Sequence, residues 1–318
     1  MKHLLLMLVM FMVSNHMNSS IISVLSWNIL GPATRDVERF GFVQGDYSRL
    51  EKTIAVIQQY QADIICLQEV DKISLHYLNH ILLCDYHCVA YQEKGLHGGV
   101  VVYAKRLLFE VEKTFECSLS SGDKNKPGAL AGGVLTHVDK IPLFIGSIHF
   151  SRSHDRRSMN SGKMQIEAIY EALRDSLPQQ IIFAGDFNTL YEEMLYESLP
   201  FMNILWPISF NLFSHQSFTA NRSDGNFLSI DHVMFSHIKL IEKDSMVGNR
   251  DYIHKAVLVT REIMKHELFQ LVQKVVPSDH LPMFVLFDID FYIKQEKIEQ
   301  RGDSMFLNYG AGVKKVNK

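Results

Sequence analysis

Several apolar, strand-like runs of this chain stop abruptly at a polar residue of a kind that binds metal ions and phosphates. The clearest runs span residues 24–28, 63–69, 143–149 and 181–188, and they end at Asn28, Glu69, His149 and the pair Asp186 and Asn188. A strand that is buried on both faces of a sheet has a continuously hydrophobic sequence. Polar residues at the ends of such strands lie at the rim of a rigid sheet, where side chains from several strands can converge.

Two later segments add candidates to the same set. The run 229–235 carries Asp231 inside an otherwise apolar strand, and Asp279 and His280 directly precede the apolar run 281–287. A buried carboxylate without a partner is costly, so we expect a charged or protonated neighbour, such as a histidine, beside Asp231. Together with the strand-end residues, this series of polar side chains is typical of a metal-dependent hydrolase.

Each of these residues taken alone has a simpler explanation. Asn28 is compatible with a turn, Glu69 with the acidic start of a helix, and His149 with a hydrogen-bonded core histidine. Asp186 and Asn188 are more specific, because a single Asx turn explains one of them and not easily both. If every residue had only such a local structural role, their occurrence in one ordered series would be a coincidence at each motif. The pattern therefore favours one joint site.

Between the motifs the sequence has a mixed α/β pattern. Asp46 is the expected N-cap of a helix that runs to about Tyr60, and further helices are expected over 72–83 and 162–177. Strands alternate with helices early in the chain and then cluster. We therefore expect a four-layered α/β/β/α sandwich, in which two mixed sheets pack together with helices outside.

The motif series is not divided by any linker-like tract rich in proline, glycine or serine. One domain should therefore span about residues 21–290, and residues 291–318 should form a peripheral extension. The expected oligomeric state is a monomer.

Composition narrows the possible functions only modestly. The 318 residues are 47% hydrophobic, enough for a large core. The formal net charge of −3 argues against a protein that coats nucleic acid by bulk electrostatics, but it does not exclude a nuclease. The four cysteines are too few for a fold built on disulfides; Cys66 is expected in the core, and Cys84 and Cys88 could pair after export.

The N-terminus bears on the compartment of the protein. Met1, Lys2 and His3 precede the apolar run 4–13, which has the length of a signal-peptide core and is too short to span a bilayer permanently. We therefore expect residues 1–20 to be a leader, the mature chain to lack a transmembrane segment, and the protein to be exported. The alternative is translation from Met17, which would leave the protein in the cytoplasm.

The ordered motif set resembles the endonuclease/exonuclease/phosphatase superfamily, which has the fold of deoxyribonuclease I. Within the superfamily, three sequence motifs most resemble the branch of nocturnin and the carbon-catabolite-repressor deadenylases. They span residues 26–30, 49–71 and 276–280. One departure is Asp231-His232, where that branch has an Asp-Tyr pair. The resemblance covers about residues 21–290, and it implies that Asp186 can contact a second metal ion.

Cleavage of a phosphoester requires charge neutralisation and an activated water. We expect Mg²⁺ or Mn²⁺ to be held by Glu69 with help from Asn28 and Asp279, because carboxylate and amide oxygens suit these cations. His280, held by Asp231 within hydrogen-bond distance, is the expected general base.

The remaining candidates are assigned to the substrate. Asp186 and Asn188 are expected to position the nucleophile and a phosphate oxygen, and His149 to donate to the phosphate or the leaving group. A cluster after the His149 strand forms either a substrate-phosphate clamp or an ordinary solvated loop; it consists of Arg152, His154, Arg156 and Arg157.

Three classes of function remain open. The first is a metal-dependent nuclease, such as a 3′-exonuclease on RNA, which the deadenylase-like segments favour; nucleic acid is therefore preferred over phospholipid as the partner. The second is a hydrolase of phospholipid (sphingomyelin) or phosphoinositide, favoured by the leader and the near-neutral charge. The third is a non-catalytic binding protein, against which the intact polar set argues. Aromatic residues beside basic ones in the cleft would favour nucleic acid, whereas an exposed apolar hairpin would favour a membrane interface.

Overall fold

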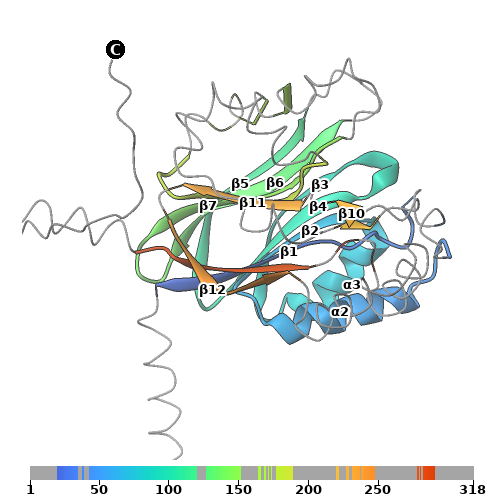
Figure 1. The fold of residues 1–318 in the computed structure, drawn as a ribbon, viewed down its shortest axis with the longest axis horizontal. Helices are drawn as coiled ribbons and strands as arrows, with labels where there is room; N and C mark the ends of the chain where they lie inside the picture. The colour runs from blue at the N-terminus through green and yellow to red at the C-terminus, as the bar shows by residue number, and fades with distance from the viewer. Residues whose placement is uncertain are drawn as a thin grey trace, which may run out of the picture.

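The computed structural model describes residues 20–34, 38, 43–119, 127–151, 164–165, 168–169, 171, 173, 177–188, 220–221, 227–228, 231–236, 238–247, 278, 280 and 282–290. Most of these residues belong to two sheets that pack face to face (Figure 1).

One sheet has six strands, which are in spatial order β12 (Lys239–Val247), β13 (Met283–Asp288), β1 (Ile21–Asn28), β2 (Ile64–Val70), β4 (Gly99–Lys105) and β3 (Tyr86–Glu93). The other has five, in the order β11 (Asp231–Ser236), β8 (Ile181–Asp186), β7 (Pro142–His149), β6 (Gly128–His137) and β5 (Phe109–Leu119). A short ribbon pairs β9 (Ala220–Asn221) with β10 (Phe227–Leu228).

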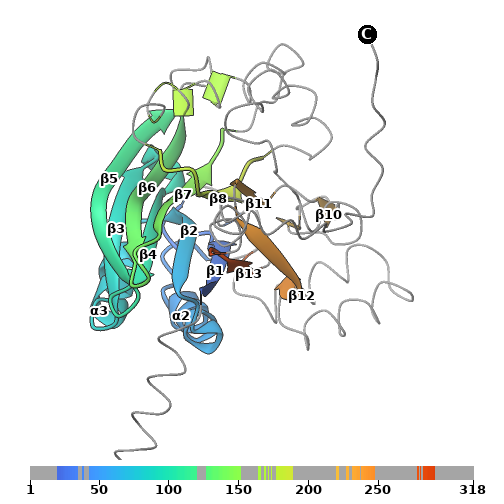
Figure 2. The same ribbon diagram turned by 90° about the vertical axis from the view of Figure 1, so that its left-hand side faces the viewer.

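Helices cover the outer faces of the two sheets. Helices α2 (Ser48–Tyr60) and α3 (Lys72–Leu82) lie against the six-stranded sheet, on the side away from the five-stranded sheet (Figures 1 and 2). Their apolar faces share a buried cluster with that sheet, which includes Leu25, Leu50, Ile54, Ile65 and Leu78. On the other outer face, Ile169 and Leu173 pack against the five-stranded sheet, and both lie at helical positions. The predicted α/β/β/α sandwich is therefore confirmed.

The core between the two sheets is largely apolar, and one buried hydrogen bond, from Gln68 Nε2 to Ser147 Oγ at 3.0 Å, crosses it. Its buried cluster includes Val24, Ile64, Val102, Ile145 and Ile182. Because such an interior is packed as densely as an organic crystal, the two sheets behave as one rigid support.

Strand direction brings the polar strand ends to one edge of this support. β1 and β2 run parallel, as do β7 and β8, and the register places His149 beside Asp186. β11 runs antiparallel to β8 and begins at Asp231, directly opposite Asp186. β13 runs antiparallel to β1, so its first residues, which follow His280, lie at the end of β1 where Asn28 is found.

The predicted helices match the structure closely, with one error at a helix start. Tyr47 occupies the N-cap position of α2, so the prediction of Asp46 as the N-cap is wrong. The Asp46 carboxylate, one position before the N-cap, accepts a hydrogen bond from the Ser48 N–H at 3.0 Å. In the predicted helix over 162–177 the described positions from Met164 to Leu173 are helical, whereas Leu177 is not.

Cys66 is buried as predicted, while Cys84 is exposed, Cys88 is partly buried, and both are free thiols. In the part of the chain that the structure describes, no helix is both long and apolar enough to span a membrane. Apart from Ser20, the expected leader lies outside the described residues, as does the expected extension over 291–318.

Candidate active site

Asn28 joins the two sheets at the polar edge. Its side chain is fully buried, and Nδ2 donates to Glu69 Oε1 at 3.0 Å and to Asp186 Oδ2 at 3.1 Å. Its Oδ1 accepts from the Leu30 N–H at 3.1 Å. In this arrangement Asn28 holds the two carboxylates in place, and ligation of a cation by its oxygen remains a prediction that requires the amide to turn over.

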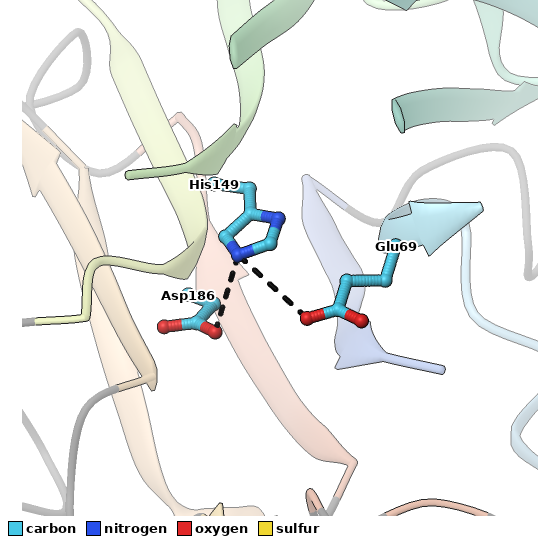
Figure 3. A group of neighbouring side chains, drawn as sticks. All are labelled: Glu69, His149 and Asp186. Carbon is cyan, nitrogen blue, oxygen red and sulfur yellow. Dashed lines mark ion pairs between the residues drawn. The ribbon is translucent and has the colours of Figure 1, made fainter. Parts of the chain in front are cut away.

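Glu69, His149 and Asp186 come from three different strands and point toward one another (Figure 3). His149 Nε2 lies 3.8 Å from Glu69 Oε1 and 3.6 Å from Asp186 Oδ2. Burial lowers the pKa of His149 well below its usual range, and the charges of neighbouring Lys94, His280 and His97 lower it further. The lowered pKa favours the neutral ring, and at these distances both carboxylates are close neighbours of Nε2 without being hydrogen-bonded to it.

His280 and Asp231 form the predicted hydrogen-bonded pair. His280 Nδ1 lies 2.8 Å from Asp231 Oδ2, and both residues are buried. His280 Nε2 faces the site, 3.5 Å from Asn28 Nδ2 and 3.8 Å from Asp186 Oδ2. A carboxylate that fixes one ring nitrogen while the other faces the reaction space is the arrangement of a general base.

The main chain around His280 is tied to the end of β1. The Trp27 indole N–H donates to the His280 carbonyl at 2.9 Å, and the Ser278 hydroxyl donates to the Asn28 carbonyl at 2.6 Å. These bonds join segments that are far apart in the sequence, and they explain how His280 is held beside Asn28.

The turn after β8 places Asp186 and Asn188 together. Asp186 Oδ1 accepts from the Asn188 N–H at 2.8 Å, which leaves Oδ2 facing the site. Asn188 has a positive φ of 50°, and its Nδ2 donates to the Phe150 carbonyl at 2.9 Å. The turn also needs Gly185, because a Cβ there would lie 1.9 Å from the Ile148 carbonyl oxygen.

Lys94 belongs to this site, although it was not predicted from the sequence. The side chain is buried, and Nζ donates to the Phe150 carbonyl at 2.9 Å, the same oxygen that accepts from Asn188. Burial lowers the pKa of Lys94 to about 8, while Asp186 and Glu69 favour its charged form. The one available signal was its position at the end of a strand-like run, directly before Gly95.

The donor set fits a divalent cation. Glu69, His149 and Asp186 each offer a ligand atom within 4.8 Å of the others, and a second group of Asp186, Asp231 and His280 does the same. Because Asp231 and His280 are hydrogen-bonded to each other, the first group is the better candidate, with Glu69 and Asp186 as its carboxylate ligands. Two carboxylates held together in a largely buried site favour a bound cation, and carboxylate oxygens suit Mg²⁺ or Mn²⁺.

Several predicted site residues lie outside the described part of the chain. They are the predicted metal ligand Asp279 and the predicted phosphate clamp of Arg152, His154, Arg156 and Arg157. Their roles remain predictions.

Comparison with known proteins gives one family match. The model of the Endonuclease/Exonuclease/phosphatase family matches residues 25–280. No curated protein sequence gives a significant match.

Solved structures with a similar fold include ANGEL2, described as a 2′,3′-cyclic phosphatase in complex with adenosine-2′,3′-vanadate. The sequence identity to ANGEL2 is 16% and the TM-score is 0.60, over 85% of this chain and 96% of that one. TDP2 of D. rerio, complexed with a single-strand DNA product, has 14% identity and a TM-score of 0.59 over 84% and 99% of the two chains. A family protein from Bacteroides thetaiotaomicron has 18% identity and a TM-score of 0.53 over 85% and 98%. At these identities the likeness shows a shared fold.

Proposed function

Because the chain belongs to the endonuclease/exonuclease/phosphatase family, we propose that it is a divalent-cation-dependent phosphoesterase that cleaves phosphodiester bonds of nucleic acid. The convergence of Glu69, His149 and Asp186 next to the buried pair of Asp231 and His280 carries this proposal. The predicted superfamily is confirmed, whereas the finer assignment to the nocturnin and deadenylase branch is not.

In this proposal, one part of the site binds the cation and another accepts the proton of the attacking water. Glu69 and Asp186 would hold the cation, with Asp279 as a further predicted ligand, and the ion would supply charge neutralisation at the phosphate. His280 Nε2 accepts a proton from the attacking water, while Asp231 keeps the ring in place and stabilises the imidazolium that forms.

The other side of the site would bind the phosphate. The neutral ring of His149 presents Nε2 toward the reaction space and can donate to a phosphate oxygen or to the leaving group. Lys94 adds a buried positive charge, and Asn188 shares with it the Phe150 carbonyl that fixes both side chains. Donors that are held in place before the reaction cost no reorganisation when negative charge develops.

Nucleic acid is the substrate class we favour, and a 3′-exonuclease on RNA is the form we propose first. The deadenylase-like segments support this choice, as do the nucleotide and DNA ligands named for the ANGEL2 and TDP2 structures. A phospholipid hydrolase ranks second. On the described hairpin between β3 and β4, Leu96 is the large exposed apolar side chain, and a single such residue is not a membrane-binding patch.

An activity panel tests this proposal. Purified protein with Mg²⁺ or Mn²⁺ should degrade single-stranded RNA with a free 3′ hydroxyl faster than DNA, a nucleoside 2′,3′-cyclic phosphate, sphingomyelin or a phosphoinositide. A preparation of His280→Ala, purified in the same way, shows whether the activity belongs to this protein. Hydrolysis of sphingomyelin or phosphoinositide without nuclease activity would overturn the choice of substrate.

A further inference from the structure

Glu69 has an unusual backbone conformation at the end of β2. Its φ is +55°, in the left-handed region that a glutamate rarely adopts, and the pairing of β2 with β4 shifts register between Leu67 and Val70. Leu67 packs on the helix side of the sheet, and regular alternation would place Glu69 on the same side. The irregularity instead directs the Glu69 carboxylate toward Asn28 and His149. A local distortion thus places the principal candidate ligand in the site.

Two neighbouring turns hold this distorted backbone. The Gly31 N–H donates to the Glu69 carbonyl at 2.8 Å, and a Cβ at Gly31 would lie 2.4 Å from that oxygen. On the hairpin that precedes β4, Gly98 has a φ of +73°, and a Cβ there would lie 2.7 Å from the Glu69 carbonyl carbon. Both contacts are close enough that only glycine fits without a shift of the backbone.

Asp71 ties the first of these turns to the end of β2. Its Oδ2 accepts from the Ala33 N–H at 3.1 Å and from the Ser74 hydroxyl at 2.9 Å. Its Oδ1 accepts from the N–H groups of Ile73 at 3.0 Å and Ser74 at 2.9 Å. The same carboxylate therefore caps α3 and holds the turn that carries Gly31. Asp71 is itself buried, so the link is shielded from water.

We propose that Asp71 is a positioning residue for Glu69. By fixing the turn after β1 against the end of β2, it keeps the Gly31 N–H on the Glu69 carbonyl and keeps the Glu69 carboxylate directed into the site. This inference rests on the proposed function, because it concerns the residue proposed to hold the cation. A role in capping α3 alone would stabilise the protein without affecting cation binding.

Asp71→Asn separates these two roles. Asparagine caps a helix about as well as aspartate, so its Oδ1 can keep the bonds to Ile73 and Ser74. Its NH₂ group then faces the Ala33 N–H. Because both groups are donors, the hydrogen bond that ties the turn to the end of β2 is lost. Asp71→Ser is a second variant, because the shorter hydroxyl can cap α3 and cannot also reach Ala33.

Asp63 supplies a matched control at the opposite end of the same strand. Its Oδ2 accepts from the Ser23 N–H at 2.9 Å and the Ser23 hydroxyl at 2.7 Å, and its Oδ1 accepts from Lys105 Nζ at 2.8 Å. Asp63→Asn disturbs a similar set of bonds, far along β2 from Glu69.

The experiment measures Mn²⁺ affinity of the metal-free proteins by titration calorimetry and the hydrogen exchange of the backbone amides in residues 29–33. Asp71→Asn and Asp71→Ser should bind Mn²⁺ about 10- to 100-fold more weakly than the wild type, the range for loss of a group that orients a metal ligand. The Gly31 and Ala33 amides should exchange faster, and Asp63→Asn should bind Mn²⁺ as the wild type does.

Three outcomes would overturn a claim, and they can be told apart. Wild-type Mn²⁺ affinity in both Asp71 variants would overturn the positioning role alone. Equal weakening by Asp63→Asn would also overturn it, because the effect would then come from general loss of stability. A wild-type protein that binds no Mn²⁺ would overturn the proposed function and this inference together.

Discussion

At the scale of single residues, substitutions of His280 and Asp231 test the proposed general-base catalysis. His280→Ala should lower kcat by about two to four orders of magnitude, the range for loss of a positioned general base. Asp231→Asn should also slow the reaction, because the amide can hold the ring in the wrong tautomer. The double variant should lose far less than the product of the two effects, since the residues act as one unit through their 2.8 Å contact. Steady-state rates at saturating substrate and Mg²⁺ measure this, and a fully active His280→Ala would contradict it.

Lys94 gives the site a dependence on pH. Its pKa is lowered to about 8 by burial, so the side chain carries its charge below that pH and loses it as the pH rises. We expect kcat/KM to fall on the alkaline side with a midpoint near that value. Lys94→Met should lower kcat/KM by about 100-fold at neutral pH, as for loss of one fixed donor to a developing negative charge, and should remove this alkaline limb.

Lys105→Met is the control for Lys94, because Lys105 is a partly buried lysine whose partner, Asp63, lies at the far end of β2. Its kcat/KM and its pH profile should match the wild type. An unchanged alkaline limb in Lys94→Met would show that another group causes the decline.

The sequence predicted that the described strand-end residues Asn28, Glu69, His149 and Asp186 come together, but it did not predict Lys94. Asp231 was predicted to have a partner such as a histidine, because a carboxylate in an apolar strand is costly without one. A lysine in a glycine-rich turn is exposed by default, and no local feature shows that the hairpin folds inward against Phe150. The pattern predicted Asn28 as a ligand of the cation, and it could not show that Nδ2 faces the Glu69 carboxylate while Oδ1 accepts from the Leu30 N–H.

At the scale of secondary structure, the hairpin between β3 and β4 is predicted to hold Glu69 in place. Gly98→Ala forces a residue with φ +73° to carry a Cβ 2.7 Å from the Glu69 carbonyl carbon. We expect it to lower the free energy of unfolding by about 1–3 kcal/mol, the cost of a strained backbone position, and to reduce kcat as well. Denaturant unfolding and steady-state kinetics measure the two effects.

Gly95→Ala on the same hairpin is the matched control. Gly95 also has a positive φ, of 61°, but a Cβ there meets nothing within 4 Å. The control should therefore lose some stability and keep its kcat. Equal kinetic effects of the two variants would show that contact with Glu69 is not what matters at Gly98.

The elements themselves were largely predictable, because their patterns are local. Three strands end at the predicted residues, which are Asn28, His149 and Asp186. Helix α3 also lies where the sequence predicts a helix. The N-cap of α2 was misplaced because Asp46 bonds to Ser48 from outside the helix, a geometry that sequence spacing does not distinguish. Glu69 was predicted in the site from its place at a strand end, but the backbone distortion that turns it there was not, since period-two alternation assigns it to the helix side.

At the scale of the whole molecule, the sandwich was predicted and the strand order was not. Antiparallel pairing of β1 with β13 joins the two ends of the domain, and the bond from Trp27 to the His280 carbonyl spans 253 positions. Such contacts depend on the global fold and leave no local mark in the sequence. They nevertheless complete the site, because they bring His280 to Asn28.

The N-terminus provides a prediction at this scale. Ser20 lies directly before β1, which starts at Ile21, and its hydroxyl donates to Asp288 Oδ1 at 3.0 Å. We propose that residues 1–20 act as an export leader, so the mature chain should begin near Ser19 or Ser20 and be found outside the cytoplasm. N-terminal sequencing of the native protein measures this. An intact Met1, or a start at Met17 in a cytoplasmic fraction, would contradict it.

Dependence on a divalent cation is the central claim, and one set of rate measurements tests it most directly. The rate of RNA hydrolysis is measured before and after excess EDTA, after Mg²⁺ or Mn²⁺ is restored, and for Glu69→Gln, which keeps the shape of the side chain and removes its charge. The wild type should lose its activity in EDTA and regain it with the metal, whereas Glu69→Gln should fold normally and stay nearly inactive at every Mg²⁺ concentration. Wild-type activity that persists unchanged in EDTA would contradict the account.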